Sequence, residues 1–227
     1  EVKSYTNLNI PATVAKLATD IQTTERINRT INKPYFVMLS TIEARKNHLL
    51  ILQIFRNLAQ TDPENTPHLY IIGKRGWEAE QVFDILDRCP IIKKHITEIN
   101  NCQDHELRNY LQNAQALLFP SFAEGYGLPL IEAIQLNTPV IASNLAVFKE
   151  IAADIPEYID PLDGMAWQKA ILAYTSSQSS ARKEQQKKIQ NFIAPSWQEH
   201  FQIVDRFLQT LRCSFKHYQQ EKQQPWL

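Results

Sequence analysis

The sequence predicts an α/β protein built on a doubly wound parallel sheet, and two observations carry this prediction. Short continuous apolar runs, such as YFVML at 35–39, are typical of strands buried on both faces of a sheet. Each run is followed by a segment with apolar residues at helical spacing, and this alternation repeats along residues 34–175. Strand–helix alternation favours parallel pairing, with helices on both faces of the sheet.

The periodicity places the individual elements in order. Strands are expected at 35–39, 68–72, 95–99, 116–119, 140–142 and 157–159. The helices between and after them are expected at 47–59, 77–87, 104–113, 128–136, 145–151 and 165–173. A charged helical run follows at 181–192, and Pro195 opens a last helix with an apolar stripe.

Composition divides the chain into three parts. Residues 1–33 are polar and rich in Thr and Asn, so we interpret them as an interdomain linker or the tail of a missing N-terminal domain, with a helix near 12–21. Residues 34–175 form the Rossmann-like sheet domain. Residues 176–227 form C-terminal helices and a Gln-rich tail that we expect to be frayed.

The composition and charge of the chain argue against several classes of protein. Twenty-four basic and 24 acidic residues cancel, and no long basic run appears, so nothing favours binding to nucleic acid. No apolar run approaches the roughly 18 residues that suggest a membrane span, and no secretory pattern opens the chain. The chain begins at Glu1, so we expect an excised fragment. Three scattered cysteines form no CxxC pair, so neither a disulfide framework nor a zinc site is indicated.

Three loops that follow strands are chemically unusual, and ligands of open parallel sheets bind at the carboxyl ends of strands. Loop 40–47 places Arg45 and Lys46 just before a helix, where cations are unfavourable unless an anion binds beside them. A solvated cation pair remains the alternative. Loop 73–77 opens on Gly73, which permits a close backbone approach or simply a tight turn.

The third loop is the most informative. It holds two of the five glycines in the chain, Gly125 and Gly127, and leads into a helix whose first turn contains Pro129. The backbone N–H groups at the start of this helix can face a phosphate, and the flanking carboxylates of Glu124 and Glu132 can accept hydrogen bonds from sugar hydroxyls. This pattern fits a ligand with both a sugar and a diphosphate, although two ordinary glutamates would also explain it.

The segment EGYGLPLIEA at 124–133 resembles the Glu-x7-Glu signature of the family 4 (group 1) retaining glycosyltransferases, which have the GT-B fold. Further similar segments follow the family order: TIEARKN at 41–47, GKRGW at 73–77, NTPVIAS at 137–143, FKEI at 148–151, DP at 160–161 and PSW at 195–197. The resemblance covers residues 34 to about 210 and departs at Asn137, where the family usually has Gly. It identifies the chain as similar to the C-terminal, donor-binding domain.

The resemblance implies a hexosyltransferase that moves a sugar from a nucleotide sugar to a glycan or lipid-linked acceptor. Glu132 would bind the ribose hydroxyls, Glu124 would contact the donor sugar as a catalytic residue, and catalytic Lys46 would neutralise the leaving diphosphate. The remaining donor-binding positions would be Gly125, Tyr126, Gly127, Leu128, Arg45, Thr41 and Gly73. Thr41 stands where many relatives carry an Arg, which weakens the case for a clamp of two cations.

The resemblance further implies that no cofactor or metal is needed, and that the donor is a UDP- or GDP-sugar, with a UDP-glucose-like donor as the default. An N-terminal GT-B domain, absent from this chain, would carry the acceptor site and a catalytic His. None of the six histidines here lies in a matching motif, and His48 alone is near the proposed site. We therefore expect donor binding with little or no transfer and a cytoplasmic location. The full protein could associate peripherally with the inner face of the plasma membrane.

Three other functions compete with this interpretation. A non-catalytic nucleotide-sugar-binding module or sensor would keep the same loop. An NAD-dependent oxidoreductase would need a Gly-rich turn after the first strand, and residues 40–47 contain no glycine. A phosphorylase-like relative would bind pyridoxal phosphate through a lysine, which the family signature disfavours.

Overall fold

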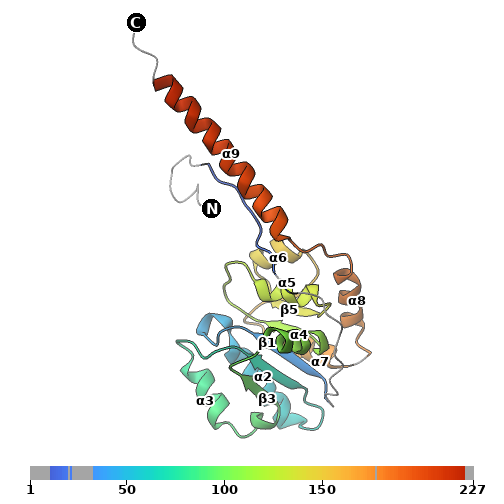
Figure 1. Ribbon diagram of the computed structural model, residues 1–227. Coiled ribbons are helices and arrows are strands. Elements are labelled where there is room, and N and C mark those ends of the chain that lie inside the picture. The colour runs from blue at the N-terminus through green and yellow to red at the C-terminus, as the bar shows by residue number, and fades with distance from the viewer. Residues whose placement is uncertain (1–10, 20, 22–32, 177, 223–227) are drawn as a thin grey trace. The chain divides into compact units, whose positions relative to one another are not determined.

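The computed structural model describes residues 11–19, 21, 33–176 and 178–222, with side chains up to residue 212 (Figure 1). The chain divides into two compact units. One comprises residues 21–193 and holds the sheet, and the other comprises residues 1–20 and 194–227.

Six parallel strands form one sheet in the order β3-β2-β1-β4-β5-β6. Their bounds are Tyr35–Leu39 (β1), His68–Ile72 (β2), Ile96–Ile99 (β3), Leu117–Phe119 (β4), Val140–Ser143 (β5) and Glu157–Ile159 (β6). The chain builds outward from β1 to β3 and then returns to place β4 on the other side of β1, so the direction of winding reverses between β1 and β4. Such a reversal is the topological switch point at which α/β folds bind their ligands.

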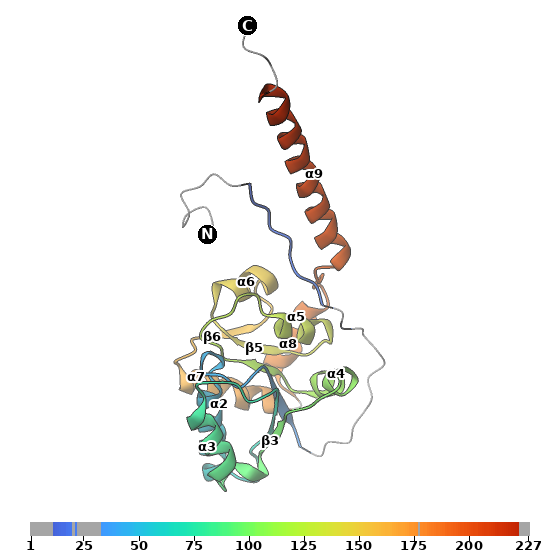
Figure 2. The same cartoon turned by 60° about the vertical axis from the view of Figure 1, so that its left-hand side comes forward.

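Helices connect the strands and follow the last of them (Figures 1 and 2). In chain order they are η1 (Ala44–Lys46), α2 (His48–Thr61), α3 (Glu80–Arg88), η2 (Ile92–Lys94), α4 (Asp104–Asn113), α5 (Leu128–Gln135), α6 (Ala146–Ala152), α7 (Gly164–Thr175), α8 (Ser180–Ile189) and α9 (Trp197–Lys222).

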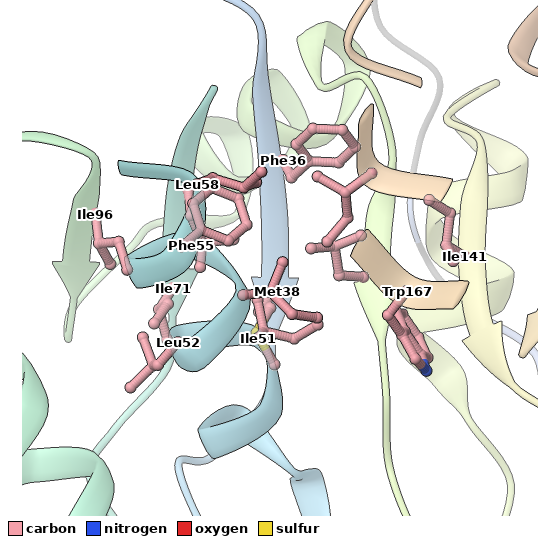
Figure 3. Close-up of a cluster of buried hydrophobic side chains, with 14 of the residues drawn as sticks. Phe36, Met38, Ile51, Leu52, Phe55, Leu58, Ile71, Ile96, Ile141 and Trp167 are labelled. Atoms are coloured by element: carbon pink, nitrogen blue, oxygen red, sulfur yellow. The ribbon is translucent and has the colours of Figure 1, made fainter. Parts of the chain in front are cut away.

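Alternate residues of β1 face opposite sides of the sheet, and both sides are buried. Met38 joins the core that Phe55 of α2 and Trp167 of α7 share, and Figure 3 shows these side chains together. On the other side, Phe119 of β4 packs against Phe148 of α6, with their ring centroids 4.9 Å apart. Burying each large apolar side chain contributes about 1.5–3 kcal/mol, which explains why these strands read as continuous apolar runs.

The predicted fold class is confirmed, and the strands fall within one or two residues of the expected positions. The helix expected at 77–87 begins later, at Glu80. The helix expected near 12–21 is wrong, because the described residues 11–19 adopt no regular helix. Helix α8 belongs to the unit of the sheet, since buried Gln185 accepts a hydrogen bond from the N–H of Val140 (2.7 Å) and donates one to its carbonyl (2.8 Å).

The second unit contains residues 11–19 and helix α9, whose start was predicted from its Ser-Trp pair. Ser196 caps this helix: its hydroxyl accepts from the N–H of Glu199 at 3.1 Å, and its own N–H donates to the Glu199 carboxylate at 3.2 Å. Within the described part of the chain, no helix has the length and apolar character that a membrane span requires. Of the Gln-rich tail expected to be frayed, residues 219–222 continue helix α9, and residues 223–227 lie outside the described part of the chain.

Candidate functional site

Two loops meet at the switch point of the sheet, and the loop after β1 is joined there to the loop after β4. The backbone N–H of Phe122 donates to the carbonyl of Arg45 at 2.8 Å. Asn47 Nδ2 donates to the carbonyl of Pro120 at 3.2 Å and to that of Pro161, after β6, at 3.0 Å. Asn47 has a left-handed backbone (φ 55°), which Asn tolerates better than most residues. One side chain thus holds three loops at the carboxyl edge, and sequence analysis did not single it out.

A charged cluster forms where these loops meet. Lys46 Nζ lies 2.5 Å from Oε1 of Glu124, and Arg45 Nη1 lies 3.2 Å from Oε2 of the same carboxylate. The hydroxyl of Ser121, which is fully buried, donates to Glu124 Oε1 at 2.7 Å. The side chain of Glu124 is only 7% exposed and that of Lys46 only 10%. The interpretation of residues 45 and 46 as a solvated pair is therefore wrong for Lys46.

Arg45 lies at the rim of this cluster. Its side chain is half exposed, its Nη1 donates to the carbonyl of Ala123 at 3.2 Å, and its Nε lies 2.7 Å from Oε1 of buried Glu43. Two cations and two carboxylates therefore balance each other within the cluster. Lys46 is further packed against an aromatic face, with its Nζ 5.6 Å from the ring centroid of Phe119.

The glycine loop leads directly into α5, whose first residue is Leu128. Gly127 is the residue before the helix and has φ +104°, and no side chain caps this helix start. A Cβ at Gly127 would lie 2.8 Å from the Phe148 ring, whereas a Cβ at Gly125 would meet nothing within 4 Å. Gly127 is therefore required by the fold itself, while Gly125 borders open space. Tyr126 and Leu128 are half-buried beside them.

Glu132, the second glutamate of the signature, lies in a different neighbourhood from the first. Its pKa is raised above the usual range, first by burial and then by the charge of Asp104 at the start of α4. Glu124 instead contacts the loop after β1. The two carboxylates thus have different charged neighbours, and Gly125 and Gly127 lie between them in the chain. Their division between ribose and sugar stays a prediction.

Thr41 and Gly73 lie where the loop after β1 packs on the loop after β2. A Cβ on Gly73 (φ +152°) would fall 1.9 Å from the carbonyl oxygen of Ser40. The N–H of Ile42 donates to the carbonyl of Lys74 at 2.9 Å. Gly73 thus has a packing role that supports the loop carrying Arg45 and Lys46. Direct donor contacts from Thr41 and Gly73 stay predictions.

His48 begins α2 and is only 1% exposed. Burial, followed by the charge of Lys46, lowers its pKa to about 4, so the imidazole is neutral at pH 7. Its Nε2 lies 3.4 Å from the hydroxyl oxygen of Ser40. His48 is thus a neutral packing group beside the cluster.

Ser121, Glu43 and Asn47 belong to the candidate site by their contacts, and sequence analysis did not single them out. The spacing of Ser121 three residues before Glu124 was the one local signal for a hydroxyl–carboxylate bond. Among the residues that the structure describes, no group of three or more His, Cys, Asp or Glu side chains is arranged to hold a metal ion. Metal independence of the reaction stays a prediction.

Comparison with known sequences shows the family. Residues 21–201 match the family described as "Glycosyl transferases group 1". The chain is 38% identical over 121 residues to the serotype-specific mannosyltransferase WbdA of Escherichia coli, covering 53% of this chain and 15% of that protein. It is 31% identical over 129 residues to the O-antigen chain mannosyltransferase B of E. coli, covering 57% of this chain and 33% of that protein. The chain therefore spans at most about a third of these two relatives.

Solved structures agree on the fold. A point mutant of TarM from S. aureus, crystallised with fondaparinux, α-GlcNAc-glycerol and UDP, superposes with a TM-score of 0.70 at 14% identity over 91% of this chain and 41% of that one. WaaG, a glycosyltransferase of lipopolysaccharide biosynthesis, gives a TM-score of 0.62 at 17% identity over 77% of this chain and 49% of that one. With a family match over most of its length and the matching fold, this chain belongs to the group 1 glycosyltransferases.

Proposed function

We propose that this chain is the donor-binding half of a retaining glycosyltransferase, and that it holds a nucleoside diphosphate sugar at the carboxyl ends of β1 and β4. One observation carries the proposal. Buried Lys46 and half-exposed Arg45 meet Glu124 at the switch point of the sheet, beside the uncapped start of α5. Cations and helix N-termini together attract phosphate, and carboxylates accept sugar hydroxyls.

The chemistry follows from these positions. When the bond between the sugar and the diphosphate breaks, negative charge accumulates on the leaving phosphate oxygens. Lys46 is held close to that position, so its stabilisation is greatest in the transition state and lowers the barrier. Glu132 is the proposed acceptor for the two ribose hydroxyls. The backbone from Gly125 to Leu128 is proposed to hold the diphosphate and the sugar.

The identity of the sugar is proposed from the relatives. Both E. coli proteins compared above are named mannosyltransferases, so we propose a mannosyl donor in place of the default UDP-glucose-like one. The same relatives disfavour a sensor without catalytic function. The acceptor site on a further domain, the cytoplasmic location and a peripheral association with the membrane stay predictions.

Calorimetric titration tests the proposal. The chain is titrated with UDP, GDP and ADP, and then with GDP-mannose and UDP-glucose. One nucleotide should be favoured, and Glu132→Ala should weaken its binding by about 10- to 100-fold, since a charged acceptor for two hydroxyls is lost.

The matched control is Glu150→Ala, an exposed glutamate on α6, which should bind as the unmodified chain does. Absence of binding by all three nucleotides would contradict donor binding. Full affinity in Glu132→Ala would contradict the assignment of the ribose contact.

A further inference from the structure

The carboxylate of Glu124 is already engaged by partners from the chain itself. Oε1 accepts from Lys46 Nζ at 2.5 Å and from the Ser121 hydroxyl at 2.7 Å, while Oε2 accepts from Arg45 Nη1 at 3.2 Å. A carboxylate oxygen offers about two acceptor positions, so Oε1 is full and Oε2 has one position left. In this arrangement Glu124 has little capacity to accept sugar hydroxyls.

The partners of Glu124 are the groups that would attract a phosphate. Lys46 is buried, and the helices on either side, α2 and α5, both begin without a side-chain cap. Helix starts carry a partial positive charge, which adds to the charge of the two cations. Glu124 is thus placed where it neutralises a site suited to an anion, and a second anion could contact Lys46 fully only if this carboxylate moved away.

We propose that Glu124 is a built-in competitor of the donor diphosphate. Before the donor binds, Glu124 forms ion pairs with Lys46 and Arg45. When the donor binds, its phosphate oxygens replace Glu124 as the partners of these two cations. The released carboxylate then accepts the hydroxyls of the donor sugar. This inference rests on the proposed function and deepens it, because it assigns Glu124 a role toward the phosphates as well as toward the sugar.

This exchange of partners makes the site selective for a ligand that carries both a diphosphate and a sugar. A nucleoside diphosphate alone displaces Glu124 but supplies no sugar hydroxyls, so a poorly solvated carboxylate loses its cations without compensation. A nucleoside diphosphate sugar supplies both the phosphates and the hydroxyls. The site should therefore hold the donor more tightly than the product diphosphate, which favours product release.

A contact with the sugar alone and a competition for Lys46 predict different diphosphate affinities for the variant Glu124→Gln. If Glu124 contacts only the sugar, Glu124→Gln leaves the affinity for free diphosphates unchanged. If Glu124 competes for Lys46, the neutral amide frees the cation, and affinity for free diphosphates rises. The Gln side chain has the same size and still offers an oxygen to Ser121, so the packing is preserved.

The experiment is calorimetric titration of the 227-residue chain and its variants with inorganic pyrophosphate, the favoured nucleoside diphosphate and its sugar-linked form. In Glu124→Gln, affinity for pyrophosphate and for the nucleoside diphosphate should rise about tenfold, because a nearby like charge is removed. The preference for the sugar-linked form over the free diphosphate should fall. Asp154→Asn is the matched control, because it breaks another carboxylate–lysine pair, with Lys188 at 2.9 Å, near the start of β6.

Each outcome decides between the hypotheses. Unchanged or weaker diphosphate binding in Glu124→Gln would overturn the competition. In that case, nucleotide binding by the unmodified chain would still support the proposed function. Absence of nucleotide binding by both chains would overturn the proposed function itself. If Glu124→Gln does not fold, Glu124→Asp provides the test: its shorter side chain loosens the pair with Lys46, so diphosphate affinity should rise by a smaller factor, and an unchanged affinity would overturn the competition.

Discussion

Gly125 and Gly127 stand two residues apart before α5, and the structure gives opposite reasons for the missing side chain at each. Gly127 has φ +104°, a region that residues with a side chain rarely adopt. A Cβ there would lie 2.8 Å from Cε1 of Phe148, which is fully buried. At Gly125 the backbone has no positive φ, and a Cβ would enter open space.

The substitution Gly127→Ala should therefore destabilise the fold. The unfavourable backbone conformation contributes about 1–3 kcal/mol, and the crowding of Phe148 contributes a similar amount. Together they lower the free energy of unfolding by about 2–6 kcal/mol, out of the roughly 5–15 kcal/mol typical of a domain.

Gly125→Ala should behave in the opposite way. Its free energy of unfolding should stay within about 1 kcal/mol of the unmodified chain, because the new methyl group meets nothing and Ala restricts the unfolded chain. The methyl group would, however, occupy the space in which we place the donor. Nucleotide binding should therefore weaken although stability is unchanged.

Urea denaturation followed by far-UV circular dichroism measures stability, and calorimetry measures nucleotide affinity in the same two variants. A Gly127→Ala chain within about 1 kcal/mol of the unmodified one would refute the backbone reasoning. A Gly125→Ala chain with full affinity would refute the placement of the ligand against this loop.

Two further predictions concern the core around the site and the docking of α8. The pKa of His48 falls from about 6.5 to about 4 on folding, so the unfolded chain binds the extra proton; stability should drop by up to about 3 kcal/mol as pH falls from 6.5 to 4. This part of the loss should be absent in His48→Gln and retained in the exposed control His105→Gln, as measured by denaturation at each pH. Gln185→Ala leaves the N–H and carbonyl of Val140 without their partner and should cost about 2–4 kcal/mol in thermal or urea unfolding, whereas exposed Lys187→Ala on the same helix should change little. If Gln185→Ala lowers the free energy of unfolding no more than Lys187→Ala does, the role of Gln185 is contradicted.

The expected elements succeed where the local sequence decides the structure. Helix α4 covers the expected 104–113, because Glu106 bonds back to the N–H of Gln103 at 3.1 Å and so marks the helix start chemically. Helix α3 begins three residues later than expected. The preceding residues are held instead by the loop after β1, where the N–H of Gly76 donates to the carbonyl of Ile42 at 3.0 Å. That competing contact comes from a distant segment, so local periodicity does not reveal it.

The prediction of a helix near 12–21 is wrong for a similar reason. A helix was expected there from a weak local pattern, but the described residues 11–19 are not helical, and Nδ1 of His200 lies 3.0 Å from the carbonyl oxygen of Lys16. The partner lies 184 residues away along the chain, so the conformation of this segment depends on a contact that no local pattern contains.

The sequence by itself determined the fold class, the strand and helix order and the two loops that form the candidate site. These depend on apolar periodicity, glycine and proline positions and the glutamate signature, all of which are local in the chain. Only the tertiary structure decided that Glu124 binds Lys46 across 78 residues, that Ser121 supports it, and that burial and then the charge of Asp104 raise the pKa of Glu132. The physical reason is the strand order: β4 lies beside β1, and this adjacency brings two distant loops within hydrogen-bonding distance.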